Sequence, residues 1–221
     1  MMKELSKRIL TSIFLSILLI SAFFNKYVLI TLLALLSTVS WIEFNSLISK
    51  IVNKNNFLII FFNTISLIYL VFFSSIVFEG VSGDYKNFML FIFLICIFSD
   101  IGGFFFGKLF KGRKLTKISP NKTLSGSIGS FILSLLLVPF FYYNSEAHEI
   151  LNKKLEFYIF FVIFISFTCQ LGDIFISYLK RKAKVKDTGN LLPGHGGLLD
   201  RIDGMLLAIP VSLLISLILQ L

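Results

Sequence analysis

Residues 57–78, FLIIFFNTISLIYLVFFSSIVF, decide the fold class because they form a long apolar run without a charged side chain. A helix needs about 20 such residues to cross the hydrocarbon core of a bilayer. The apolar residues do not alternate with polar ones, as they would in the strands of a membrane barrel. The run therefore predicts a transmembrane helix.

Runs of this kind recur along the whole chain, which has 56% hydrophobic, 16% aromatic and only 15% charged residues. That composition excludes a soluble globular protein. We predict an all-α, polytopic transmembrane helix bundle of about seven spans. The spans are Ile9–Phe24, Tyr27–Ile48, Phe57–Phe78, Phe88–Gly107, Ser127–Tyr143, Phe157–Leu179 and Gly204–Leu221. The first run also has features of a cleaved signal peptide, but a retained span is favoured because no small-residue cleavage site follows it.

The basic residues predict the orientation of the spans. When the seven spans are threaded back and forth, all but four of the 21 Lys and Arg residues lie on one side. The four exceptions are Lys26, Lys86, Lys153 and Lys154. The positive-inside rule then places the N-terminus and the loops 108–126 and 180–203 in the cytoplasm, and the C-terminus outside. The net charge of +9 is explained by this topology and by anionic lipid headgroups, so a nucleic-acid partner is not expected.

One loop has an unusual composition. The stretch 177–203, SYLKRKAKVKDTGNLLPGHGGLLDRID, places Lys, Arg, Gly and Asp between two apolar segments. Cations neutralise phosphates, glycine backbone approaches them closely, and carboxylates hold a bridging metal ion. We therefore expect a single membrane domain, 1–221, with N-terminal spans in 1–87 and a catalytic half in 88–221 that carries the two basic loops.

Four carboxylates lie within or at the edge of predicted spans, near the cytoplasmic side of the membrane: Asp100, Asp173, Asp200 and Asp203. Ionisable groups are costly in lipid and mark functional sites. A buried carboxylate cluster repels itself unless a cation is bound, and oxygen ligands of this kind suit Mg²⁺. Alternatives are a salt bridge for Asp100, Asp173 or Asp200 and a helix cap for Asp203. Glu43 is equally a packing partner or a site residue.

A second polar segment follows the fourth predicted span. Gly102, Gly103 and Gly107 allow close approach of a helix or a ligand. The turn at 119–125, with its hydroxyl groups and Lys122, has donors suited to phosphate oxygens. It is not a Walker A loop, because the GxxxxGK[ST] spacing is missing.

These motifs together resemble a known family. Ser177, Lys180–Arg181, Lys186–Asp187, Gly189, Leu192–Pro193, His195–Gly196–Gly197 and Asp200–Arg201–Ile202–Asp203 are similar to the signature of the phosphatidate cytidylyltransferases, also called CDP-diacylglycerol synthases. Ser99–Asp100, Ile118–Thr123 and Gln170–Asp173 resemble other parts of that family. The resemblance covers roughly residues 95 to 205.

The resemblance implies a Mg²⁺-dependent enzyme of phospholipid biosynthesis in the cytoplasmic (inner) membrane. It would condense CTP with phosphatidic acid to CDP-diacylglycerol and pyrophosphate, and the family suggests a homodimer. A lipid phosphate that attacks the α-phosphorus of CTP needs positioning and charge neutralisation rather than a protein nucleophile.

We assign the predicted site residues to three roles. The metal ligands are Asp173 and Asp203, supported by Asp200 and Asp100. The catalytic group comprises Asp173, Asp203, Lys180, Arg181, Lys186, Asp187, His195 and Arg201. The substrate-binding group comprises Ser119, Asn121, Lys122, Thr123, Gly196 and Gly197. His195 is interpreted as a phosphate donor, with a proton carrier or a helix-entry spacer as alternatives.

The chain departs from the family pattern at two positions. Ile176 and Ser125 stand where relatives commonly have Glu. Loss of these carboxylates weakens the case for a second cation and also fits a different lipid phosphate as substrate. The alternative functions are a cytidylyltransferase for a polyprenyl or ether-lipid phosphate, a CTP-dependent lipid kinase and, more remotely, an anion transporter or lipid-binding scaffold.

Overall fold

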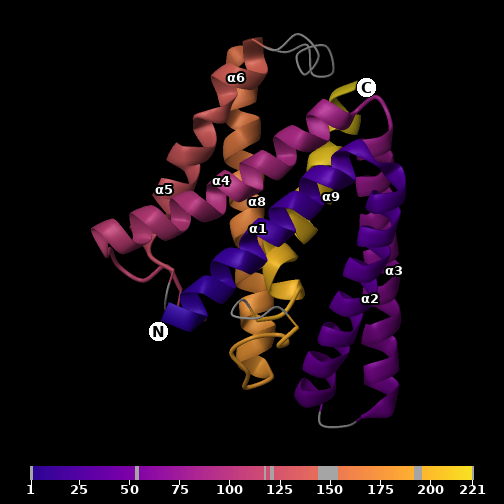
Figure 1. Ribbon diagram of the computed structural model, residues 1–221. Helices are drawn as coiled ribbons and strands as arrows, with labels where there is room; N and C mark the ends of the chain where they lie inside the picture. Colours follow the sequence, from indigo (N-terminus) through magenta and orange to yellow (C-terminus); the bar gives the residue numbers. More distant parts are fainter. Residues whose placement is uncertain are drawn as a thin grey trace. The chain divides into compact units, whose positions relative to one another are not determined.

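The computed structural model describes residues 2–52, 55–116, 118–119, 122–143, 154–191 and 196–220. The regular elements in these ranges are all α-helices (Figure 1), which confirms the predicted all-α class. They are α1 (Met2–Phe24), α2 (Lys26–Ile51), α3 (Asn56–Ser82), α4 (Lys86–Phe110), α5 (Leu124–Leu135), α6 (Leu137–Tyr143), α8 (Leu155–Lys182) and α9 (Leu199–Gln220).

Six stretches of the described chain are long and apolar enough to cross a membrane. They are Lys26–Ile51, Asn56–Ser82, Lys86–Phe110, Leu124–Tyr143, Leu155–Lys182 and Leu199–Ile218, and they match the last six predicted spans. The first predicted span differs. It lies in α1, whose apolar part is the shorter stretch Ile13–Phe24.

The fifth span is two helices rather than one. α5 ends at Leu135, α6 begins at Leu137, and the Leu136 N–H between them turns back to the Leu133 carbonyl at 3.3 Å. Pro139 explains the break, because its ring has no N–H to donate and clashes with the carbonyl four residues earlier. Hydropathy alone does not reveal such a break.

The chain forms two compact units. Unit 1 contains 1–82 and 179–202, and unit 2 contains 83–178 and 203–221. The chain passes between the units within α8 and again within α9.

In unit 1, α2 and α3 lie side by side (Figure 1) and are joined by polar contacts. The Trp41 indole N–H donates to the Asn63 carbonyl at 3.1 Å, and the Asn63 amide donates to Asn45 Oδ1 at 2.7 Å. Such bonds hold helices together in lipid, where apolar burial gives little net drive. They anchor the part of α2 that carries Glu43.

In unit 2, α4 and α5 approach closely through glycines. A Cβ at Gly102 would collide with the Gly129 backbone, and a Cβ at Gly129 would collide with Phe106. The Ser130 hydroxyl, which is also at this contact, donates to the Ser99 carbonyl at 2.7 Å. Small-residue packing was the alternative interpretation of Gly102 and Gly103, and it accounts for Gly102. As a result, Asp100 lies next to a tightly packed helix crossing.

Candidate functional site

α8 and α9 cross in unit 2 at a pair of glycines. A Cβ at Gly172 would lie 2.5 Å from the Asp203 carbonyl oxygen, and a Cβ at Gly204 would collide with Cys169. Each glycine is followed or preceded by an aspartate, so the close crossing brings Asp173 and Asp203 together. The carboxyl groups of Asp173 and Asp100 are both near enough to interact with the Asp203 carboxyl group electrostatically.

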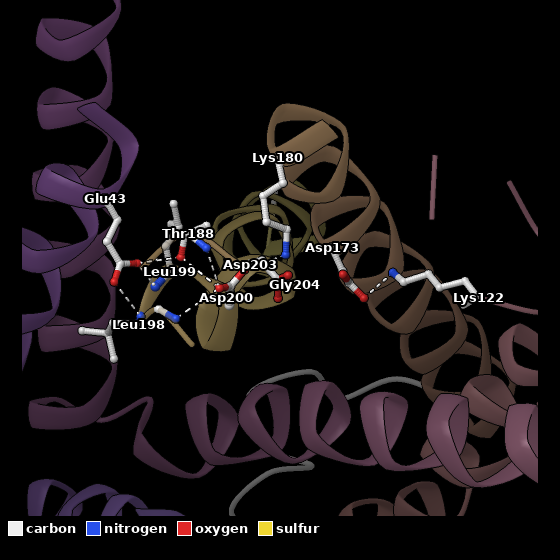
Figure 2. Close-up of polar contacts among 11 residues, drawn as sticks. Glu43, Lys122, Asp173, Lys180, Thr188, Leu198, Leu199, Asp200, Asp203 and Gly204 are labelled. Carbon is white, nitrogen blue, oxygen red and sulfur yellow. Dashed lines mark hydrogen bonds and ion pairs between the residues drawn. The ribbon is translucent and has the colours of Figure 1, made fainter. Parts of the chain in front are cut away.

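Lys122 balances part of this negative charge. Its ammonium forms an ion pair with Asp173 (Figure 2). The segment between α4 and α5 holds Lys122 in place. The Leu115 N–H donates to the Lys122 carbonyl at 2.8 Å, and the Lys122 N–H donates to the Ser119 carbonyl at 3.0 Å. The polar turn that was predicted to bind phosphate therefore places its lysine against Asp173.

Thr123 ends this segment and begins α5. Its backbone is extended, and its hydroxyl oxygen accepts the Gly126 N–H at 3.1 Å, which is the geometry of an N-terminal cap. The hydroxyl also lies 3.1 Å from the Ser125 hydroxyl, whose oxygen accepts the Gly112 N–H at 3.2 Å. Ser125, one of the two departures from the family pattern, thus fastens the loop backbone.

Ile176, the other departure, is buried at 4% exposure. It lies on the buried face of α8 with Cys169, Gly172 and Ser177. A carboxylate there would need a polar partner or a cation.

Gln170 lies one turn before Asp173 on α8. Its Oε1 accepts the Ser127 hydroxyl at 2.5 Å, whereas its Nε2 is buried and has no hydrogen-bond partner within the described part of the chain. A buried amide donor without a partner is costly and is a natural contact for a ligand oxygen. Gln170 was given no role from the sequence, although a polar side chain inside an apolar span is costly in lipid and indicates a functional position.

In unit 1, Asp200 is surrounded by donors (Figure 2). Its Oδ1 accepts from the Lys180 ammonium at 2.6 Å. Its Oδ2 accepts the Thr188 N–H at 2.9 Å, the Thr188 hydroxyl at 3.0 Å and the Gly197 N–H at 3.2 Å. Asp200 and Lys180 therefore form the salt bridge that was the alternative reading for this carboxylate, and together they fasten the connection between α8 and α9.

The end of α8 shapes the start of that connection. The Val185 N–H donates to the Lys180 carbonyl at 3.0 Å, and the Lys184 N–H donates to the Arg181 carbonyl at 3.1 Å. Lys184 has a φ of 56°, in the left-handed region. This is the Schellman pattern of helix termination, with lysine at the position that glycine commonly takes.

Glu43 reaches from α2 to the same connection. It is buried at 7% exposure, and its carboxylate accepts from the Thr188 hydroxyl at 2.8 Å, the Leu198 N–H at 3.0 Å and the Leu199 N–H at 2.9 Å. The sequence left Glu43 open between packing partner and site residue, and it did not single out Thr188.

The remaining predicted residues fall into two groups. Arg181, Lys186, Asp187 and Arg201 are exposed, and Gly196, with a φ of 84°, lies beside Asp187. Asn121 and His195 lie outside the described residues. Among the described residues, no group of three or more His, Cys, Asp or Glu side chains is arranged to hold a metal ion.

Comparison with known proteins now gives the family. The family model described as "Cytidylyltransferase family" matches residues 1–219. The chain belongs to the cytidylyltransferase family. The residues that suggested this family, from Ser99 to Asp203, thus lie inside a match that extends over nearly the whole chain.

Curated relatives carry a more specific name. A phosphatidate cytidylyltransferase of Helicobacter pylori (strain ATCC 700392 / 26695) is 38% identical over 133 residues, which are 58% of this chain and 48% of that protein. The one from Bacillus subtilis (strain 168) is 40% identical over 126 residues, 55% of this chain and 45% of that protein. The one from Rickettsia typhi (strain ATCC VR-144 / Wilmington) is 38% identical over 134 residues, 57% of this chain and 58% of that protein. The chain spans about half the length of the curated relatives it matches.

Proposed function

We propose that this protein condenses CTP with phosphatidic acid to form CDP-diacylglycerol and pyrophosphate. The observation that carries the proposal is the similarity to several phosphatidate cytidylyltransferases within a cytidylyltransferase family match. Apolar helices that can span a membrane suit a lipid substrate, and the basic loop residues suit phosphates.

In the proposed reaction, a phosphate oxygen of phosphatidic acid attacks the α-phosphorus of CTP. A new P–O bond forms there, the bond from the α-phosphorus to the bridging oxygen breaks, and pyrophosphate leaves. The nucleophile is already an anion at neutral pH, so the protein's task is to orient the two phosphates and offset their repulsion. Lys122, Arg181, Lys186 and Arg201 are the cations proposed for this task, with Ser119, Asn121, Thr123, His195, Gly196 and Gly197 as further phosphate or nucleotide contacts.

Asp173 and Asp203 are the proposed Mg²⁺ ligands, with Asp100 near them. Mg²⁺ in phosphoryl-transfer sites is held by one or two carboxylates together with substrate oxygens and water, so a pair of carboxyl groups fits it. When bound, the ion would neutralise phosphate charge and fix the direction of the phosphate oxygens. Asp200 is not included, because both of its oxygen atoms already accept hydrogen bonds.

The test uses purified protein in detergent with Mg²⁺, CTP labelled at the α-phosphate and phosphatidic acid. Labelled CDP-diacylglycerol and an equal amount of pyrophosphate are expected. Parallel reactions with a polyprenyl phosphate, an ether-lipid phosphate and diacylglycerol distinguish the alternative substrates. Absence of a labelled lipid with every acceptor would refute the enzymatic proposal. We also propose that the protein lies in the bacterial cytoplasmic membrane as a homodimer, with its basic loops facing the cytoplasm. The orientation of the loops has a separate test by cysteine labelling.

A further inference from the structure

Unit 1 contains a line of polar contacts that starts within a transmembrane helix. Glu43 on α2 contacts Thr188, Thr188 contacts Asp200, and Asp200 contacts Lys180 at the end of α8 (Figure 2). We call these four residues the Glu43 relay. It joins parts of the chain that are 145 residues apart, at Glu43 and Thr188.

Glu43 binds the beginning of α9 by its backbone. The Leu198 and Leu199 N–H groups are among the first amides of the helix, which have no partner within the helix itself. A carboxylate there satisfies them and interacts favourably with the positive end of the helix dipole. Burial of the carboxylate is costly unless these donors stay in place, so the contact fixes where α9 begins.

The backbone around Glu43 leaves no room for side chains. A Cβ at Gly189 would lie 2.5 Å from Glu43 Oε1, and a Cβ at Gly197 would lie 2.5 Å from Glu43 Oε2. Glycine is therefore needed at both positions, because Glu43 occupies the space beside Gly189, and the Thr188 hydroxyl together with Glu43 occupies the space beside Gly197. This arrangement gives Gly189 and Gly197 a packing reason for being glycine that does not depend on any contact with a phosphate.

Thr188 couples Glu43 to Asp200. Its hydroxyl oxygen lies 2.8 Å from Glu43 Oε2 and 3.0 Å from Asp200 Oδ2, so the two carboxylates share one hydroxyl hydrogen, and the Thr188 N–H donates to Asp200 as well. Displacement of Glu43 therefore disturbs Asp200, and with it the Gly197 N–H and the Lys180 ammonium.

We propose that Glu43 is a positioning residue, which acts through Thr188 and the start of α9 to hold the α8–α9 connection in its working conformation. The inference rests on the proposed function, because the connection contains Lys186 and Gly196 and leads into α9 at Arg201, and these three residues are proposed phosphate or nucleotide contacts. Glu43 itself is not a catalytic residue: it touches the protein segment and not the reacting atoms.

Glu43→Gln tests the holding role, with Glu79→Gln as the matched control. Both changes remove one negative charge from unit 1, but Glu79 on α3 is exposed. A glutamine at position 43 places an amide N–H₂ against a donor N–H group. Amide hydrogen exchange followed by mass spectrometry should become about tenfold faster at Thr188 and 197–199 in Glu43→Gln and stay unchanged in Glu79→Gln. Equal exchange in the two variants overturns the proposal.

Thr188→Val and Thr188→Ser test the coupling without altering Glu43. Valine keeps the shape and removes the hydroxyl, whereas serine keeps the hydroxyl. We expect Thr188→Val to lower kcat/KM about tenfold, with a higher KM for CTP or phosphatidic acid, and Thr188→Ser to stay within about twofold. A smaller folded fraction would lower kcat alone, so the rise in KM reports a misplaced connection.

The outcomes separate this inference from the proposed function. Faster exchange in Glu43→Gln with unchanged kcat and KM, or equal activity of the valine and serine variants, overturns the positioning role and leaves the cytidylyltransferase reaction standing. If the unsubstituted protein makes no CDP-lipid, the proposed function fails, and the positioning role in that reaction is overturned with it. The hydrogen-exchange comparison still shows in that case whether Glu43 holds the connection.

Discussion

The aspartates of the two units differ in what their oxygen atoms contact. Asp200 accepts from an ammonium, a hydroxyl and two backbone N–H groups, so its charge is offset by the protein. Asp203 accepts the N–H of Gly204 at 2.9 Å and is near enough to the Asp173 carboxyl group to interact with it electrostatically. Two neighbouring carboxyl groups are a poor arrangement for stability, and they attract a cation. Asp200 and Asp203 are three positions apart, but Asp200 is proposed to stabilise the α8–α9 connection and Asp203 is proposed to bind Mg²⁺.

Replacement of Asp203 tests the proposed metal site. Asp203→Asn keeps the volume and removes the negative charge, so we expect turnover to fall by about 100-fold or more while the protein stays folded. Mg²⁺ should raise the Tm of the unsubstituted protein by mass action, and this rise should shrink in the variant. Asp84→Asn is the control, because Asp84 is an exposed aspartate of the same unit. Near-normal activity with an unchanged response to Mg²⁺ would contradict the assignment.

The Lys122–Asp173 pair gives a second prediction at this scale. Lys122→Met removes the ammonium that faces Asp173 and leaves a partly buried carboxylate without its partner. We expect kcat/KM for CTP to fall by about 100-fold. Lys114→Met is the control, since Lys114 is exposed in the same segment. Steady-state kinetics of both variants at fixed lipid concentration provides the measurement, and equal losses in the two would argue against a specific role for Lys122.

At the scale of elements, hydropathy predicted where helices cross the membrane but not how they touch. The α4–α5 contact depends on Gly102 and Gly129, and the α8–α9 contact depends on Gly172 and Gly204. From the sequence, Gly102 could have had either a helix or a ligand as its close neighbour. A glycine in an apolar run shows that something approaches closely, and only the packed structure shows what approaches.

The α4–α5 contact can be tested by overpacking. Gly102→Ala places a Cβ against the Gly129 backbone, which cannot move aside as a flexible side chain would. We expect a loss of about 1–3 kcal/mol in stability and a lower Tm in detergent. Ile101→Ala is the control, because Ile101 precedes Gly102 on α4 and is 51% exposed. If both variants melt at the temperature of the unsubstituted protein, the close approach of α4 and α5 is not needed for stability.

At the scale of the whole molecule, local sequence signals predicted the helical spans, but contacts between residues far apart in the sequence could not be predicted. The spans follow from runs of about 20 apolar residues. The phosphate-binding residues, taken from dense motifs in single loops, stay a prediction. Glu43 and Leu199 are 156 residues apart, so no spacing rule connects them. The break at Leu136 was also missed, because a hydropathy window averages over a proline.

The sequence also predicts the membrane topology of the whole chain, that is, the side of the membrane on which each loop lies. Because spans alternate in direction, the segments 111–123 and 183–198 should lie on one side of the membrane and 83–85 on the other, whether or not α1 crosses. The excess of Lys and Arg in the first two segments predicts that their side is the cytoplasm, where CTP is available.

Cysteine labelling in intact and permeabilised cells measures this directly. The native Cys96 and Cys169 are both buried, so they contribute little background. We expect Lys114→Cys and Asn190→Cys to react with a membrane-impermeant maleimide only after permeabilisation, and Asp84→Cys to react in intact cells, since all three positions are exposed. Labelling of Lys114→Cys or Asn190→Cys in intact cells would place that loop outside, away from CTP, and would overturn the predicted topology together with the proposed reaction.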